Sequence, residues 1–141
     1  MKEIDLSNNK KLKYLDVTNN EISKLDVSLN MNLEELSCNW NNINVLDVSN
    51  NLALTSLQFN YNGISEIDIS NNKKLQYICC EHTNVSSLDT SNNPELLSIY
   101  CDNTDIKTID LTNNPKVFEL ICDEGTEIIG KEQLTDLYYG Y

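Results

Sequence analysis

A period of twenty-one residues constrains this chain more than any other feature of its sequence. A segment of the form I/L-D-x-S/T-x-N begins at residues 4, 25, 46, 67, 88 and 109, and no insertion interrupts the series. Between these segments runs a second one, L-x-x-L-x-(C/V/F)-x-x-(N/T)-x-I, with few departures. A unit of this length is too short to bury its own apolar side chains, so successive units must stack and share one core.

The period and the leucine positions are typical of a leucine-rich repeat. We therefore predict a β-rich solenoid, a right-handed coil with a parallel β-sheet on its concave face and little or no helix. Residues 1–124 are expected to form about six repeats, the first one partial, and residues 125–141 a C-terminal capping tail with a helical turn around residues 131–138. The uncovered strand edge at the N-terminal end predicts an edge-to-edge homodimer.

The charge of the chain narrows the classes of partner. There are 22 acidic and 10 basic side chains, which gives a net charge of -12, and every basic residue is lysine. Surfaces that bind nucleic acid carry clustered positive charge, and anionic lipid headgroups repel an acidic protein. The sequence also contains no apolar run long enough to span a bilayer. We expect neither nucleic-acid binding nor direct membrane insertion.

Four of the five cysteines share one inward-facing column of the predicted strands: Cys38, Cys80, Cys101 and Cys122. Val17 and Phe59 fill the same place in two other repeats. A disulfide needs Cβ atoms about 3.8 Å apart, whereas side chains of neighbouring parallel strands stand about 4.8 Å apart. A zinc ion needs four ligands around one point rather than along a row. We therefore expect free, buried cysteines acting as small apolar residues, and no metal ion or cofactor.

Cys79 lies one place earlier than this column, on the outward face of its strand, and is expected to be an accessible thiol. His82, the only histidine, is three residues away. No further base or carboxylate completes an arrangement for nucleophilic catalysis. The sequence therefore predicts no catalytic residues, and we expect that the protein is not an enzyme.

An aspartate follows the first apolar residue of every repeat: Asp5, Asp26, Asp47, Asp68, Asp89 and Asp110. Carboxylates about 4.8 Å apart repel by roughly 1 kcal/mol per pair even in water, which predicts raised pKa values along this column. The Ser or Thr two residues later suggests local side-chain-to-backbone turns, and calcium chelation is the sharper alternative. The glycine-rich pattern of calcium-binding β-rolls is missing, which favours the turns.

Asparagine occupies a second fixed place, in the turn that leaves each strand. Asn20, Asn41 and Asn62 are expected to form a ladder, because an amide side chain can pair with backbone groups that would otherwise be buried unpaired. The equivalent Thr83 and Thr104 can make fewer such bonds, and looser turns are expected toward the C-terminal end.

Exposed positions beside the strands are free to carry function, and several of them are aromatic. Trp40, Tyr61 and His82 occupy one place in three consecutive repeats. Aromatic side chains with a polar tip are favoured binding anchors, although they can also lie over a loop edge and shield the core. The candidate ligand-binding residues on the concave face are Trp40, Tyr61, His82, Tyr77, Tyr100, Gln58 and Tyr14.

The repeat "LEELSCNWNNINVLDVSNN", with its cysteine and its closing asparagine, resembles the 21-residue repeats of internalin-type bacterial surface proteins. The resemblance covers residues 4–124. It implies a curved parallel-sheet solenoid, a location outside the cell or on its surface, and adhesion-like binding of a protein or glycoprotein. It brings no catalytic residues. The function predicted from it is therefore a non-enzymatic protein- or glycan-binding module that uses the concave face. The alternative is a passive structural spacer with no ligand of its own.

Overall fold

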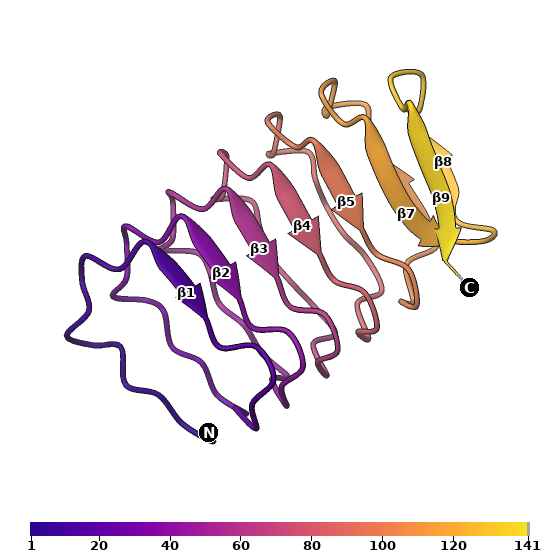
Figure 1. Cartoon of the computed structure of the whole chain (residues 1–141). Coiled ribbons are helices and arrows are strands. Elements are labelled where there is room, and N and C mark those ends of the chain that lie inside the picture. Colours follow the sequence, from indigo (N-terminus) through magenta and orange to yellow (C-terminus); the bar gives the residue numbers. More distant parts are fainter. Residues whose placement is uncertain (141) are drawn as a thin grey trace.

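The computed structural model describes residues 1–140 and shows one continuous coil of stacked turns (Figure 1). Seven short strands form a parallel sheet in the order β1-β2-β3-β4-β5-β7-β9, and β6 pairs with β8 on the other side of the coil. The strand bounds are β1 Tyr14–Asp16, β2 Glu35–Ser37, β3 Ser56–Gln58, β4 Tyr77–Cys79, β5 Ser98–Tyr100, β6 Thr108–Asp110, β7 Glu119–Asp123, β8 Glu127–Ile129 and β9 Asp136–Gly140. The predicted leucine-rich repeat solenoid with a parallel sheet and no helix is confirmed.

The register of the sheet follows the sequence period directly. Leu15 pairs with Leu36 and Leu36 with Leu57, so residues of the same column stand side by side in neighbouring strands. Their side chains turn inward, and one cluster of buried apolar residues runs the length of the coil. Each added turn therefore covers the apolar side of the turn before it, which lets a chain of modest apolar content bury a continuous core.

The cysteine column is buried and free of disulfides, as the sequence predicts. Cys38, Cys80, Cys101 and Cys122 are each no more than 1% exposed. Burial raises the pKa of the Cys38 thiol to about 12, and it raises the pKa of the other three as well. These thiols remain protonated near neutral pH and serve as core side chains.

The turn that leaves each strand is held by an asparagine amide. The Oδ1 of Asn62 accepts the N–H of Ile43 at 3.0 Å, and its Nδ2 donates to the carbonyls of Cys38 and Phe59, both at 3.0 Å. Asn41 bonds in the same way one turn earlier. The equivalent Thr83 donates one bond, to the Cys80 carbonyl, so the expected loss of bonds at this column is confirmed.

A second asparagine column, at the edge where the chain approaches the strands, ties each turn to the one before it. The Nδ2 of Asn51 donates to the carbonyls of Val27 and Asn30, at 3.0 and 2.9 Å. Asn72, Asn93 and Asn114 repeat both bonds. These bonds cross from turn to turn at a buried site, so they fix the spacing of the coil as well as its local turns.

One threonine in this layer satisfies an oxygen that other repeats leave unpaired. Thr90 Oγ1 donates to Asn114 Oδ1 at 2.7 Å. Within residues 1–140, the buried Oδ1 atoms of the equivalent Asn30, Asn51, Asn72 and Asn93 have no hydrogen-bond partner, because an apolar residue stands where Thr90 does.

We expect Thr90→Val to lower the free energy of unfolding by roughly 1–2 kcal/mol, because the Asn114 oxygen loses its donor. This loss is expected even though other repeats carry an aliphatic residue at the same place. The reverse change, Val48→Thr, places a hydroxyl beside Asn72 and is expected to be neutral or to stabilise by up to about 1 kcal/mol. Urea denaturation of both variants measures the difference. Equal losses in the two variants would contradict this account.

The aspartate column forms local turns, and the predicted rise of its pKa values is wrong. Asp47 Oδ1 accepts the backbone N–H of Ser49 at 2.9 Å, and Asp5, Asp26, Asp68, Asp89 and Asp110 accept from the Ser or Thr two residues on. Hydrogen bonds from these Ser and Thr residues lower the pKa of every carboxyl in the column. The carboxylates are exposed, so water screens their repulsion and the local bonds dominate.

The C-terminal residues extend the sheet, and the helical turn expected around residues 131–138 is wrong. Strand β9 pairs with β7, and Leu137 stands beside Leu120 in the inward column. Gln133 Nε2 donates to the carbonyl of Asn114 at 3.1 Å and so takes the place of the next ladder asparagine. The pattern L134-T-D-L137 repeats the L-x-x-L of earlier strands. The division at residue 124 and the capping role of the tail stay predictions.

Candidate functional site

Trp40, Tyr61 and His82 form a continuous stack of rings along one edge of the sheet. The Trp40 and Tyr61 ring centroids are 3.6 Å apart with planes at 12°, and those of Tyr61 and His82 are 4.1 Å apart at 16°. Trp40 is 54% exposed, Tyr61 is half-buried and His82 is exposed. Face-to-face stacking closes the ring faces inside the stack, so the stack presents mainly ring edges and the free outer face of Trp40 to solvent.

All three rings are carried on backbone in the left-handed region. The φ angles are 55° for Trp40, 55° for Tyr61 and 52° for His82. This conformation is uncommon for bulky residues and costs about 1–3 kcal/mol per residue. The same place in the flanking repeats holds Asn19 and Asn103, also with positive φ, and asparagine tolerates this conformation better. The chain thus places Trp40 and Tyr61 at positions where asparagine would be less strained, whereas histidine at residue 82 tolerates this conformation better.

The stack lies at the rim of the concave face rather than on it. The strands end at Ser37, Gln58 and Cys79, and each ring residue follows three positions later, beyond the arrowheads of β2, β3 and β4 in Figure 1. A shallow hollow runs along the stack, and its other wall is the turn residues Asn42, Asn44 and Gly63. The sequence analysis placed these rings on the concave face and not at its rim. The asparagines at the same place in the flanking repeats are a sign of left-handed backbone and could have indicated the turn.

The other candidate residues lie on the concave face and are not part of the stack. Tyr14 and Tyr77 begin β1 and β4, and two strands separate them. Gln58 ends β3 and accepts a bond from Asn39 at 3.3 Å. The Tyr100 hydroxyl donates to Glu119, and burial with this carboxylate raises the Tyr100 pKa to about 12. The structure therefore brings together three of the seven candidates and places the other four on four different strands, β1, β3, β4 and β5.

Cys79 points to the concave face as predicted, but its thiol is only partly accessible. The side chain is half-buried, and burial raises the pKa of the thiol to about 12, with a smaller contribution from Glu81. A thiol with this pKa is scarcely ionised near neutral pH, and the thiolate is the reactive form. The thiol is thus held in its unreactive state.

Glu81 and Asp102 form a carboxyl pair at the same rim, beside His82. Asp102 is 9% exposed, and within residues 1–140 its Oδ1 has no hydrogen-bond partner. Burial, followed by a hydrogen bond to Asp102 and its negative charge, raises the pKa of Glu81 to about 7. The two residues are twenty-one positions apart, so the sequence places them in one column, but it does not show how deeply the pair is buried.

We expect the free energy of unfolding to fall as the pH rises from about 4.5 to about 7. The pKa of the Glu81 carboxyl rises from its ordinary value of 4.5 to about 7 in the folded state. The folded protein therefore binds this proton more tightly than the unfolded chain between these two pH values. Thermal unfolding followed by circular dichroism measures the slope. Glu81→Gln should flatten it, whereas Glu66→Gln, on an exposed turn, should leave it unchanged; an unchanged slope in Glu81→Gln contradicts the assignment.

No group of three or more His, Cys, Asp and Glu side chains within residues 1–140 is arranged to hold a metal ion. In the same described part of the chain, no helix has the length and apolar character required to cross a bilayer. None of the nine strands contains a lysine, and acidic side chains such as Asp16, Glu35 and Glu119 point outward from them. The concave face is therefore negatively charged.

The repeats, the sheet and the buried cysteine column together define a leucine-rich repeat solenoid with cysteine-bearing 21-residue repeats. The chain is similar to the functional domain of InlJ from Listeria monocytogenes, which includes a cysteine ladder. The identity is 32% and the TM-score 0.83, over 97% of this chain and 29% of that chain.

Two other solved structures share the fold at lower identity. A leucine-rich repeat protein of Leptospira interrogans is 19% identical with a TM-score of 0.85, over 99% of this chain and 40% of that one. Internalin C2 of Listeria monocytogenes is 19% identical with a TM-score of 0.79, over 94% and 62%. The chain thus spans 29–62% of the length of these three structures. No protein-family model matches the sequence, and neither does any curated protein.

Proposed function

We propose that this chain is a non-enzymatic recognition module of a bacterial surface or secreted protein, and that it binds a protein or glycoprotein ligand. The fold supports a protein-binding role, since leucine-rich repeat proteins are found in complexes such as that of LRIM1 with APL1C. The likeness to internalins supports a location outside the cell and adhesion-like binding. The ligand would lie over the concave face and reach its rim at Trp40.

The strained aromatic stack is the observation that carries this proposal. Trp40 and Tyr61 stand where the repeat itself uses asparagine in other turns, and both are costly there because φ is positive. Their stacking recovers part of this cost, but Trp40 and His82 both remain exposed to solvent. Backbone strain of this kind is concentrated at functional sites, and Trp and Tyr are enriched among the residues that dominate binding energy.

The test replaces the anchors with the residue that the fold prefers. Trp40→Asn/Tyr61→Asn gives the rim the residue found at Asn19 and Asn103, so the variant should fold with unchanged or higher thermal stability. Wild type and variant are compared for binding to an array of extracellular host proteins and glycans. We expect the variant to lose at least about tenfold in affinity for whatever the wild type captures.

A matched control, Asn42→Ser, changes the opposite wall of the hollow without touching the rings. If the double variant binds as tightly as the wild type, the rim stack is not the anchor. If neither protein binds any member of the array, the passive spacer becomes the better description. Pairing of β1 edges between two copies remains a separate prediction, and concentration-independent monomers in analytical ultracentrifugation would contradict it.

A further inference from the structure

A second exposed patch lies on the opposite edge of the sheet, in the turns that precede the strands. Leu29, Met31 and Leu52 are 48%, 64% and 57% exposed. Met31 and Leu52 are twenty-one residues apart and so occupy the same place in successive turns. Leu29 lies beside Met31 in one of these turns. No part of residues 1–140 covers these three side chains, so they form an apolar surface on two adjacent turns.

The fold does not require apolar residues at these places. At the place of Leu29, the other five repeats carry Asn. At the place shared by Met31 and Leu52, the other four repeats carry Lys or Pro. The turn around Met31 has N–H bonds from Asn30 to Val27 and from Leu33 to Asn30, both at 3.0 Å. The turn around Lys73 has the same two bonds at the same lengths. The apolar side chains therefore add nothing to the turn itself.

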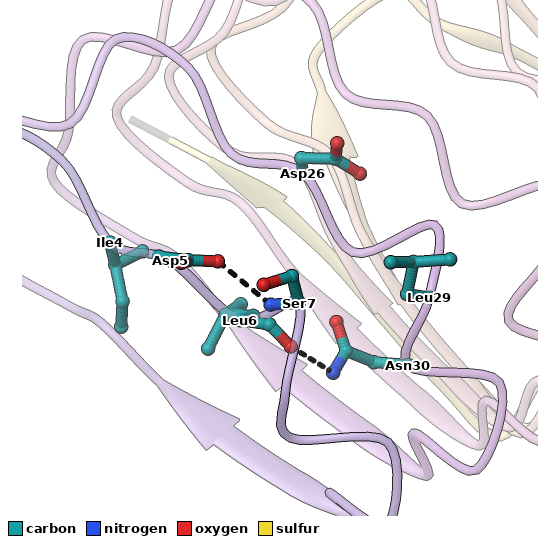
Figure 2. A pocket seen from close by; sticks show the side chains of 7 residues that line it. All are labelled: Ile4, Asp5, Leu6, Ser7, Asp26, Leu29 and Asn30. Atoms are coloured by element: carbon teal, nitrogen blue, oxygen red, sulfur yellow. Dashed lines mark hydrogen bonds between the residues drawn. The ribbon is translucent and has the colours of Figure 1, made fainter.

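Leu29 also borders a small hollow between the first two turns, with a volume of about 70 Å³. Figure 2 shows Leu29 on one side of it and Ile4 with Leu6 on the other. Asp5 and Asp26 also line it, and they accept the N–H groups of Ser7 and Ser28, at 2.9 and 3.0 Å. The hollow offers room for an apolar group next to the patch, and both of its carboxylates are already bonded.

Lysine pairs stand on both sides of the apolar turns. Along one column the order is Lys10, Met31, Leu52, Lys73, and Lys11 and Lys74 lie next to its ends. Side chains in such columns reach one another, since Lys116 Nζ and Glu95 Oε2, in the column of Lys11, are 2.6 Å apart. All four lysines are exposed, and none of them forms an ion pair within residues 1–140. Lys74 influences the carboxylate of Glu34, which is already paired with Lys13. Glu95, one turn from Lys74 in its column, is already paired with Lys116.

We propose that this lysine-flanked apolar patch (Leu29, Met31, Leu52 with Lys10, Lys11, Lys73 and Lys74) docks an acidic polypeptide segment that carries apolar side chains. The apolar residues of the segment cover the two central turns, and its carboxylates pair with the lysines on each side. In a chain of net charge -12, four of the ten lysines gather around one exposed apolar surface, and this arrangement fits a partner of opposite charge.

Two other occupants fit the patch less well. A second copy related by two-fold symmetry would place the lysine pairs of one chain against those of the other, and like charges across an interface are unfavourable. An anionic bilayer would be attracted by the four lysines but repelled by the net charge of -12. The acidic apolar segment satisfies both the charge and the exposed surface.

The test uses a fluorescent synthetic peptide of about twelve residues in which pairs of Glu alternate with Leu and Phe, measured by fluorescence polarisation at low salt, where surface charges act most strongly. Leu29→Asn/Met31→Pro/Leu52→Pro removes the apolar side chains without adding charge, and this chain carries both residue types at the same places in other turns, so the fold is preserved. Lys73→Gln/Lys74→Gln removes the charge on one side only. Both variants should bind the peptide at least about tenfold more weakly than the wild type.

Three results would overturn the proposal. One is peptide binding that is absent in the wild type or equal in the wild type and both variants. Another is capture of phosphatidylserine-containing vesicles by the wild type without capture of the peptide. The third is a wild-type dimer in analytical ultracentrifugation that the triple variant abolishes, which would make a second copy the occupant. Trp40→Asn/Tyr61→Asn should bind the peptide normally, and this separates the patch from the proposed rim site.

Discussion

Asn62→Ala is expected to lower the free energy of unfolding by about 2–6 kcal/mol, because two buried backbone groups lose their partners at about 1–3 kcal/mol each. The amide of Asn62 accepts from the Ile43 N–H and donates to the Phe59 carbonyl, both at 3.0 Å. Ile43 and Phe59 are fully buried, so water cannot replace these bonds without entering the core. The loss also uncouples neighbouring turns, since Ile43 and Asn62 belong to different repeats.

Urea denaturation followed by circular dichroism measures this loss, and two variants provide controls. Asn42→Ala changes an exposed asparagine of the neighbouring turn, next to Ile43, and is expected to stay within about 0.5 kcal/mol of the wild type. The loss of stability in Asn62→Thr should lie between those of Asn42→Ala and Asn62→Ala, because Thr83 makes a single bond, to the Cys80 carbonyl, at the equivalent place. If Asn62→Ala lost less than Asn42→Ala, the ladder would not be the source of stability.

Phe59→Ala is expected to cost about 3–5 kcal/mol, the usual range for removal of a buried phenyl group. The ring is fully buried and stands in the column that cysteine fills in four repeats. Phe59→Cys would make this turn match its neighbours at Cys38 and Cys80, yet it should still cost roughly 2–4 kcal/mol. The surrounding side chains are packed around a ring, and the smaller residue leaves a cavity.

Val17→Cys is the matched control, since it exchanges two small residues in the same column and should cost less than about 1.5 kcal/mol. Phe59→Cys and Val17→Cys each introduce the cysteine that four other repeats carry in this column. The repeat pattern alone would therefore predict the same effect on stability for the two variants. Equal stability of Phe59→Cys and wild type in urea denaturation would show that the turn closes around any small residue.

The two edges of the sheet offer different chemistry, and both depart from the repeat in a way that the fold does not need. At the rim where the strands end, Trp40 and Tyr61 replace an asparagine suited to left-handed backbone. At the other edge, Met31 and Leu52 replace lysine or proline. A solenoid whose core and ladders are fixed by its period can change such outer places at little cost to its fold, which is why we place both proposals there.

The sequence by itself determined the architecture of this protein. The twenty-one-residue period specified the parallel register, the inward cysteine column and the amide ladder, because in a stacked coil every side chain meets its own counterpart one turn away. The seventh strand was not predicted, because a shortened final turn takes the L-x-x-L at Leu134 and Leu137 out of the fixed spacing.

Only the tertiary structure decided what depends on backbone angles and on contacts between turns. The left-handed φ of Trp40 places the ring stack on the rim instead of the concave face. Bonds from Ser49 lower the pKa of Asp47, which repulsion alone would raise. The period makes Glu81 and Asp102 neighbours, but it is burial, followed by the contact with Asp102, that raises the pKa of Glu81. A period tells which residues are neighbours. Their conformation and burial set the strength and sign of each interaction, and these are known only once the chain is folded.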